Sequence, residues 1–223
     1  MRVLCIGDSL GLPREDVSYE DTWFYNLKKE FPHIEFVDYF ERRLHIYKAL
    51  SNFDNYYVFY PSDVVVIQVG ICDCSPRYVL EESLVVKLLI TFFSIIHLKH
   101  LFWKIVKLRG RRQNCVDTPI DVFYAKFDSL ITKFIGNGVK QIILVKIGHV
   151  SESVVNKNKY INNNVEKYNR VIDRLREKYP TIIGVIDPLD QVDDSLFVDG
   201  YHCNKKGMEL VYVSLRAELD NNQ

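Results

Sequence analysis

The sequence has no excess of charge of either sign and few cysteines. Its 29 Lys and Arg residues balance 29 Asp and Glu residues, so we expect no overall attraction to nucleic acid. Five cysteines, an odd number in a chain of 223 residues, predict reduced thiols rather than a disulfide framework. The chain also lacks a basic N-terminal segment followed by an apolar run and a cleavage site. We therefore expect a cytoplasmic protein.

Motifs for cofactors and metals are missing too. The segment GDSLG at 7–11 lacks the lysine and the spacing of a phosphate-binding loop. Cys72 and Cys74, followed much later by His202 and Cys203, do not have the spacing of a zinc site. We expect neither a cofactor nor a metal.

No internal repeat or low-complexity tract divides the chain, and its length suits one domain, 1–223. Five apolar runs predict strands, and three segments with apolar residues at helical spacing predict helices. Asp21 and Asn204 are candidate caps for the first and last helices. The strands are expected at 2–6, 34–39, 63–70, 141–147 and 181–187, and the helices at 21–31, 158–179 and 204–219. This alternation predicts an α/β fold, a flavodoxin-like three-layer α/β/α sandwich around a five-stranded parallel sheet.

The carboxyl ends of the strands are the expected position of a ligand site, because ligands of such sheets bind there. Four segments follow strand ends and are therefore expected on one rim of the sheet. They are 7–10, 70–77, 147–151 and the loop after Asp187.

A basic segment at about 78–117 interrupts the pattern of strands and helices. From Ser83 to Val116 it has seven Lys or Arg residues and no Asp or Glu. Its longest stretch without Lys or Arg, 88–98, has eleven residues, whereas a membrane-spanning helix needs about 20. We expect one or two amphipathic helices inserted near the rim. Four interpretations remain: packing on the core, a lid, a dimer contact, or peripheral membrane contact through 83–112.

The residues that carry chemistry lie near the two ends of the chain. An apolar strand runs into Gly7-Asp8-Ser9-Leu10, and Asp199 precedes His202 by three residues in DGYH. A serine nucleophile needs an imidazole to accept its proton, and the imidazole needs a carboxylate to hold its tautomer. We therefore predict a catalytic triad of Ser9, His202 and Asp199. The alternative for the first motif is a plain turn, since Gly and Asp are common turn residues.

These two motifs resemble those of the SGNH hydrolases, also called the GDSL esterase and lipase family. The resemblance rests on GDSL at 7–10 and DGYH at 199–202, and it covers nearly the whole chain outside 78–117. It implies the SGNH hydrolase fold with a helical insertion. It also implies a serine-type ester hydrolase in which Ser9 is the nucleophile and Asp199 and His202 complete the triad.

The resemblance further implies an oxyanion hole with three donors, and here the sequence departs from the family. The first donor is the backbone N–H of the serine, here Ser9. The second is usually the N–H of a glycine in a second motif, but no glycine occurs between positions 11 and 70. A backbone N–H near Arg42 or Arg43 is the candidate replacement.

The third donor in the family is an Asn side chain in a Gly-x-Asn-Asp motif. The matching segment here begins at Gly70 and has Cys72 in the Asn position. A thiol is a weak donor, and one good oxyanion donor is typically worth about 10²–10³ in rate. Arg77 is the candidate substitute. It has two alternative roles, binding an anionic substrate or standing as a surface arginine.

The resemblance implies an acyl or acetyl esterase acting on a small-molecule or carbohydrate ester, with acylated sugars or polysaccharide precursors as one substrate class. Two alternatives remain open. One is an acyltransferase of the same fold. The other is a relative that binds a carbohydrate or protein with little catalysis, which Cys72 and the missing glycine favour and the intact triad residues oppose.

Overall fold

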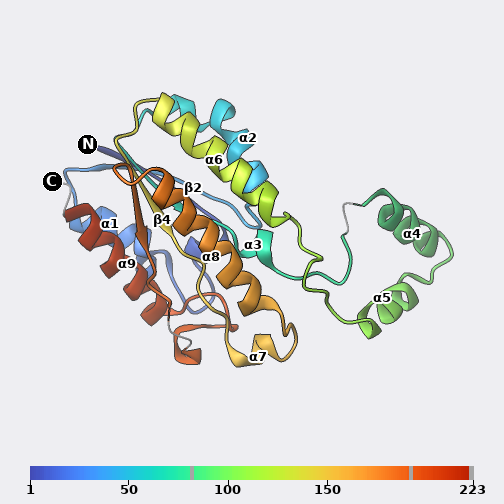
Figure 1. The fold of residues 1–223 in the computed structure, drawn as a ribbon. Helices are drawn as coiled ribbons and strands as arrows, with labels where there is room; N and C mark the ends of the chain where they lie inside the picture. The colour runs from blue at the N-terminus through green and yellow to red at the C-terminus, as the bar shows by residue number, and fades with distance from the viewer. Residues whose placement is uncertain (81–82, 191–192, 221–223) are drawn as a thin grey trace.

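The computed structural model describes residues 1–80, 83–190 and 193–220. Its centre is a five-stranded, entirely parallel sheet with the order β2-β1-β3-β4-β5 (Figure 1). This confirms the predicted fold class. The strands are β1 (Arg2–Gly7), β2 (Glu35–Phe40), β3 (Val64–Gln68), β4 (Gln141–Val145) and β5 (Ile183–Ile186).

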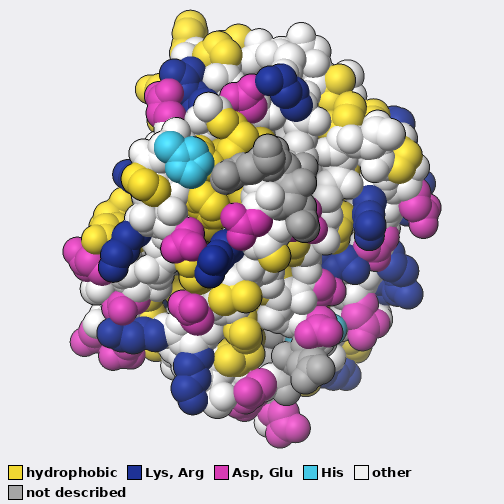
Figure 2. Space-filling view, turned by 90° about the vertical axis from the view of Figure 1, so that its left-hand side faces the viewer, with side chains coloured by type: hydrophobic (Ala, Val, Ile, Leu, Met, Phe, Trp, Pro, Cys, Tyr) yellow, Lys and Arg dark blue, Asp and Glu magenta, His cyan; other side chains and the backbone are white. Residues whose placement is uncertain are grey.

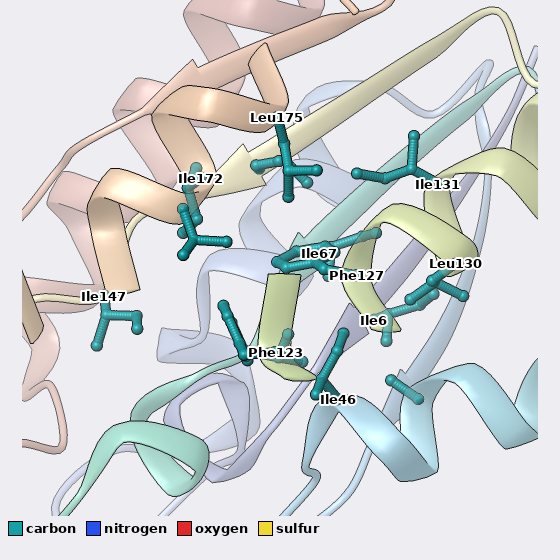
Figure 3. Packing of buried hydrophobic residues seen from close by; sticks show 14 of the residues in the cluster. Ile6, Ile46, Ile67, Phe123, Phe127, Leu130, Ile131, Ile147, Ile172 and Leu175 are labelled. Carbon is teal, nitrogen blue, oxygen red and sulfur yellow. The ribbon is translucent and has the colours of Figure 1, made fainter. Parts of the chain in front are cut away.

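Helices cover both faces of the sheet because alternate strand residues point to opposite faces and both sets are apolar. On one face, strand residues such as Val3 and Val66 pack against α1 (Trp23–Glu30) and α9 (Lys205–Asp220). The opposite face packs against α2 (Ile46–Asn55), α6 (Ile120–Gly136) and α8 (Ile161–Lys178). Figure 3 shows this second core, where Ile6 and Ile67 of the sheet meet Phe123 and Phe127 of α6.

Short elements line the connections between the main strands and helices. Four are 3-10 turns: η1 (Ser9–Gly11), η2 (Tyr19–Asp21), η3 (Tyr57–Phe59) and η4 (Asp194–Leu196). Two are single-turn helices, α3 (Ile71–Cys74) and α7 (Glu152–Val155).

The predicted strands and helices agree with the structure to within about three residues, but one cap was assigned wrongly. Asp21 ends η2, where its carboxylate accepts a hydrogen bond from the Ser18 N–H at 3.0 Å. Thr22 caps α1 instead, since its hydroxyl accepts from the Tyr25 N–H at 3.3 Å. Asn204 caps α9 as predicted and accepts from the Gly207 N–H at 3.2 Å.

The basic insertion forms two helices, α4 (Leu84–Ile95) and α5 (Lys99–Leu108), which pack against each other as a hairpin. Figure 1 shows this hairpin standing away from the sheet and its covering helices. Residues 81–82 of the insertion lie outside the described residues. Every residue of α4 is described, and none is buried, so α4 does not pack its apolar side chains on the core.

The two chain segments at the base of the hairpin are joined by backbone hydrogen bonds. The Arg77 N–H donates to the Cys115 carbonyl at 2.6 Å, and the Arg112 N–H donates to the Arg77 carbonyl at 3.3 Å. The Asn164 side chain of α8 donates to the carbonyls of Cys74 and Gln113, both at 2.9 Å. These bonds attach the hairpin to the rim of the sheet, at the carboxyl end of β3.

Candidate active site

Ser9 lies directly after β1, in a turn whose shape explains the residues around it. The Asp8 carboxylate accepts from the Leu10 N–H at 2.8 Å and so caps η1. The Asp8 N–H continues the sheet by donating to the Gln68 carbonyl at 3.1 Å. A Cβ at Gly7 would lie 2.5 Å from the Phe40 ring, so a larger residue here would have to displace that ring. The Gly-Asp-Ser sequence therefore ends the strand and places Ser9 on the rim.

Ser9, His202 and Asp199 form one chain of hydrogen-bonding side chains. The Ser9 Oγ lies 3.1 Å from His202 Nε2, across 193 positions of sequence. His202 Nδ1 lies 2.7 Å from Asp199 Oδ2, and the His202 backbone N–H donates to Asp199 Oδ1 at 3.0 Å. Both carboxylate oxygens therefore hold the histidine, one through its ring and one through its backbone.

The loop that carries Asp199 and His202 is folded tightly around Gly200. This residue has a positive φ of 95°, and a Cβ there would lie 2.4 Å from the Ser151 hydroxyl. The Gly200 carbonyl accepts from the Ser151 N–H at 2.7 Å, and the Val198 N–H donates to the His202 carbonyl at 2.8 Å. These contacts join the loop to the segment after β4, on the same rim as Ser9.

The environment of the pair favours a neutral imidazole beside an ionised carboxylate. Burial lowers the pKa of His202 and outweighs the nearby Asp199, which raises it. Burial raises the pKa of Asp199, but hydrogen bonds from His202 outweigh burial and leave it below its usual value. At neutral pH His202 is thus free to accept a proton from Ser9, and Asp199 is charged to stabilise the resulting imidazolium.

Two neighbours of the triad were missed from the sequence. The Arg14 guanidinium donates to the Ser9 carbonyl at 3.0 Å, and burial lowers its pKa. The Tyr201 ring lies over the His202 ring, with 4.0 Å between their centroids. Tyr201 lies inside the DGYH motif, so its place next to His202 in the sequence could have identified it. Arg14 follows Ser9 by five residues, and nothing in the sequence distinguishes it from other surface arginines.

The sequence predicted the backbone N–H groups of Ser9 and Arg43 as oxyanion donors. Within the described part of the chain neither donates to another backbone or side-chain group. Arg43 has a φ of 60°, in the left-handed region that favours glycine. A non-glycine residue therefore adopts a glycine-like conformation in the loop after β2, where the family resemblance implied a glycine.

Asp73 holds the loop after β2 against the loop after β3. It is completely buried and accepts from the Ile46 N–H at 3.2 Å, at the start of α2. It also accepts from the Thr118 hydroxyl at 2.5 Å. Burial raises its pKa to about 7. Asp73 therefore fixes the start of α2, which follows Arg43, relative to α3, which contains Cys72.

Cys72 remains a protonated thiol at neutral pH. Burial, with the charges of Asp8 and Asp73, raises its pKa to about 12, so it is a weak S–H donor and not a thiolate nucleophile. Gly70, which precedes it, has a φ of 127°, and a Cβ there would lie 2.6 Å from the Ile147 side chain. Glycine is therefore required at the bend between β3 and α3.

Arg77 is held by groups outside the triad. Its Nε and Nη2 donate to Asp117 at 2.8 and 2.5 Å, and Nη2 also donates to the Cys72 carbonyl at 3.3 Å. Among the described residues it has no hydrogen bond to Ser9 or His202. The structure thus places Arg77 at the base of the hairpin, where it braces the Asp117 segment.

A cavity of about 600 Å³ lies between the loop after β2 and the base of the hairpin. Arg43, His45 and Arg77 line it together with Asp117 and apolar residues of the segment before α4. In the described ranges, no group of three or more His, Cys, Asp or Glu side chains is arranged to hold a metal ion.

Comparisons of the sequence and of the fold give different results. Neither family models nor curated protein sequences match this chain. Several solved structures match its fold over nearly the full length. A lipase/acylhydrolase from Enterococcus faecalis is 14% identical, with a TM-score of 0.69, over 100% of this chain and 97% of that one. An acetyl xylan esterase, AlAXEase, is 16% identical, with a TM-score of 0.67, over 98% and 99%.

A third match is a catalytic mutant of an acetylxylan esterase from Geobacillus stearothermophilus. It is 15% identical, with a TM-score of 0.65, over 97% of this chain and 93% of that one. At such identities the likeness concerns the fold, which these proteins share with this chain from end to end. The chain has the fold of the SGNH hydrolases.

Proposed function

We propose that the protein is a serine-type ester hydrolase. The main support is a pair of consecutive hydrogen-bond contacts, from Ser9 Oγ to His202 Nε2 and from His202 Nδ1 to Asp199. The names of the proteins that share its fold, acetyl xylan esterases and a lipase/acylhydrolase, support the same reaction class.

The first half of the reaction acylates the serine. His202 Nε2 takes the Ser9 proton as Oγ attacks the ester carbonyl, and the carbonyl π electrons move to oxygen. The N–H groups of Ser9 and Arg43 stabilise the oxyanion, with the Cys72 thiol as a weak third donor. When the tetrahedral intermediate collapses, His202 gives its proton to the leaving alcohol and the acyl group stays on Ser9.

The second half repeats these steps with water. His202 removes a proton from water, the hydroxide attacks the acyl carbonyl, and Ser9 leaves with the proton returned by His202. Acid is released and the triad is restored without a cofactor. We propose acyl or acetyl esters of sugars as the substrate class. An acyl acceptor other than water would give the acyltransferase alternative with the same residues.

A fluorophosphonate probe tests the nucleophile directly. We expect a single adduct, located by peptide mass spectrometry on Ser9, because its hydroxyl is activated by His202. The matched control is Ser129→Ala, which removes an exposed hydroxyl from α6 and should be labelled normally. A folded protein whose Ser9 stays unlabelled while other serines react would favour the non-catalytic binding alternative.

Replacing Cys72 with asparagine is expected to raise turnover of a simple ester by about tenfold. The amide N–H is a stronger donor to the oxyanion than the protonated thiol. The measurement is kcat on p-nitrophenyl acetate, with Cys115→Asn at the base of the hairpin as the control. A flat or lower kcat in a folded Cys72→Asn protein would show that the thiol is not the limiting donor, and Arg77→Ala would then be the next variant.

A further inference from the structure

The outer face of α4 is apolar and exposed. Helical spacing puts six residues of α4 on one face, at i, i+1, i+4, i+5, i+8 and i+11. Their exposed fractions run from 41% to 72%, and they are Leu84, Val85, Leu88, Leu89, Phe92 and Ile95. Monomeric soluble proteins rarely expose so continuous an apolar surface without a partner.

The inner faces of the two helices already hold the hairpin together. Phe93 of α4 and Phe102 of α5 have ring centroids 5.4 Å apart, and Phe102 and Val106 are the buried residues of α5. The outer face of α4 is therefore not needed for the helix pair to form. A second exposed stripe, Leu101, Ile105 and Leu108, runs along α5 at i, i+4 and i+7.

Positive charge flanks the apolar stripe on α5, although the protein as a whole is neutral. Lys104 and Lys107 lie on α5 beside the Leu101–Leu108 stripe, and no acidic residue occurs from Ser83 to Val116. By contrast, the side of the molecule away from the hairpin mixes basic and acidic side chains with scattered hydrophobic ones (Figure 2). The hairpin thus combines apolar exposure with charge of a single sign.

A basic cavity of about 420 Å³ lies directly after α5. Among the described residues, those that line it include five cationic ones and no acidic one: Arg109, Arg111, Arg112, Lys157 and Lys159. Arg111 is held in place by a 3.0 Å hydrogen bond to the Pro76 carbonyl and by the Tyr78 ring, 4.8 Å away. The cavity has the size and charge to accept a phosphate headgroup.

We infer that the α4–α5 hairpin docks the protein on an anionic lipid surface. The exposed faces of α4 and α5 enter the interfacial region, and the basic cavity and neighbouring lysines contact the phosphate headgroups. No helix in the described ranges is long and apolar enough to cross a bilayer. The 12 residues of α4 span about 18 Å, compared with about 30 Å of hydrocarbon, so α4 lies in the interface.

A second copy of this chain fits the same surface less well. Docking two hairpins would bring two sets of cationic side chains together with no acidic residue between 83 and 116 to pair with them. An anionic membrane supplies both an apolar interior and the opposite charge. Because the hairpin leaves the sheet where β3 ends, this contact would bring the rim that carries Ser9 toward the lipid surface.

Vesicle flotation with the full-length protein tests the inference without relying on catalysis. We expect binding to phosphatidylglycerol/phosphatidylcholine vesicles at low salt, weak binding to pure phosphatidylcholine, and release at high salt. Leu88→Glu with Phe92→Glu should lower the partition coefficient by about tenfold or more, because it places charge on the apolar face. The control Phe59→Glu changes an aromatic that is 71% exposed on the body and should bind normally.

A second pair of variants tests how much the positive charges contribute to membrane binding. Arg109→Glu with Arg112→Glu should weaken binding to the anionic vesicles by about tenfold or more, whereas Lys28→Glu with Lys29→Glu on α1 should have little effect. Failure to bind anionic vesicles at low salt would overturn the inference, and so would a dimer that Leu88→Glu with Phe92→Glu dissociates. Neither result bears on labelling of Ser9.

Discussion

Replacing Ser9 with alanine is expected to lower kcat/KM for a short p-nitrophenyl ester by about 10⁴–10⁶-fold. The Ser9 hydroxyl is the group that His202 contacts at 3.1 Å, and alanine leaves the imidazole with no nucleophile to deprotonate. The remaining N–H donors still bind the oxyanion, so activity should stay above the uncatalysed rate.

The Ser9→Ala protein should keep its melting temperature to within a few degrees. The change removes one hydroxyl on a half-buried turn, while the Asp8 cap of the same turn is kept. Ser129→Ala is the activity control, since its hydroxyl contacts only the Ala125 carbonyl on an exposed helix surface. If folded Ser9→Ala retained activity within tenfold of the parent, the reaction would not pass through this serine.

Asp199→Asn is expected to reduce kcat by about 10⁴-fold while the loop keeps its shape. An amide can still accept one of the hydrogen bonds now made by the carboxylate, but it no longer holds the imidazole in the required tautomer or stabilises its charged form. Asp193→Asn is the matched control. Asp193 lies on the same loop and accepts from the Ser195 N–H at 2.8 Å, without touching His202.

The pH dependence of kcat/KM gives a second measure of the same pair. Activity requires neutral His202, so it should fall as the pH drops through the His202 pKa, which burial holds below 6.5. Asp199 opposes that effect by raising the His202 pKa. In Asp199→Asn the acidic midpoint should therefore move to lower pH. An unchanged midpoint together with an unchanged kcat would remove Asp199 from the mechanism.

Local patterns in the sequence predicted the elements that depend on near neighbours. The buried strands are β-branched runs with apolar residues facing both ways, as β3 and β4 illustrate. Asn204 was recognised as a cap because it bonds to backbone groups within three residues. Helices α2 and α6 were not assigned. Asp21 was assigned as the cap of α1, but its carboxylate bonds to Ser18, three residues earlier, and to Lys205, which is distant in the sequence.

The candidate site likewise has a local part that the sequence predicted and a long-range part that depends on the fold. The spacing of Asp199 and His202 predicted a local pair, and the two are in contact within one loop. By contrast, the 3.1 Å approach of Ser9 to His202 depends on the parallel sheet, which aligns the strand ends, and on α9, which packs on the β1 face. The contacts of Asp73 and Arg77 likewise join segments that are far apart in the sequence.

The sequence by itself determined the fold class, the two motifs and the basic character of residues 83–116, since each follows from residue type and spacing. Only the tertiary structure decided whether the apolar residues of that segment are buried. Burial depends on which surface a helix meets, and here α4 meets α5 on one side and leaves the other exposed. The left-handed conformation of Arg43 was equally hidden, because it is one that arginine does not favour.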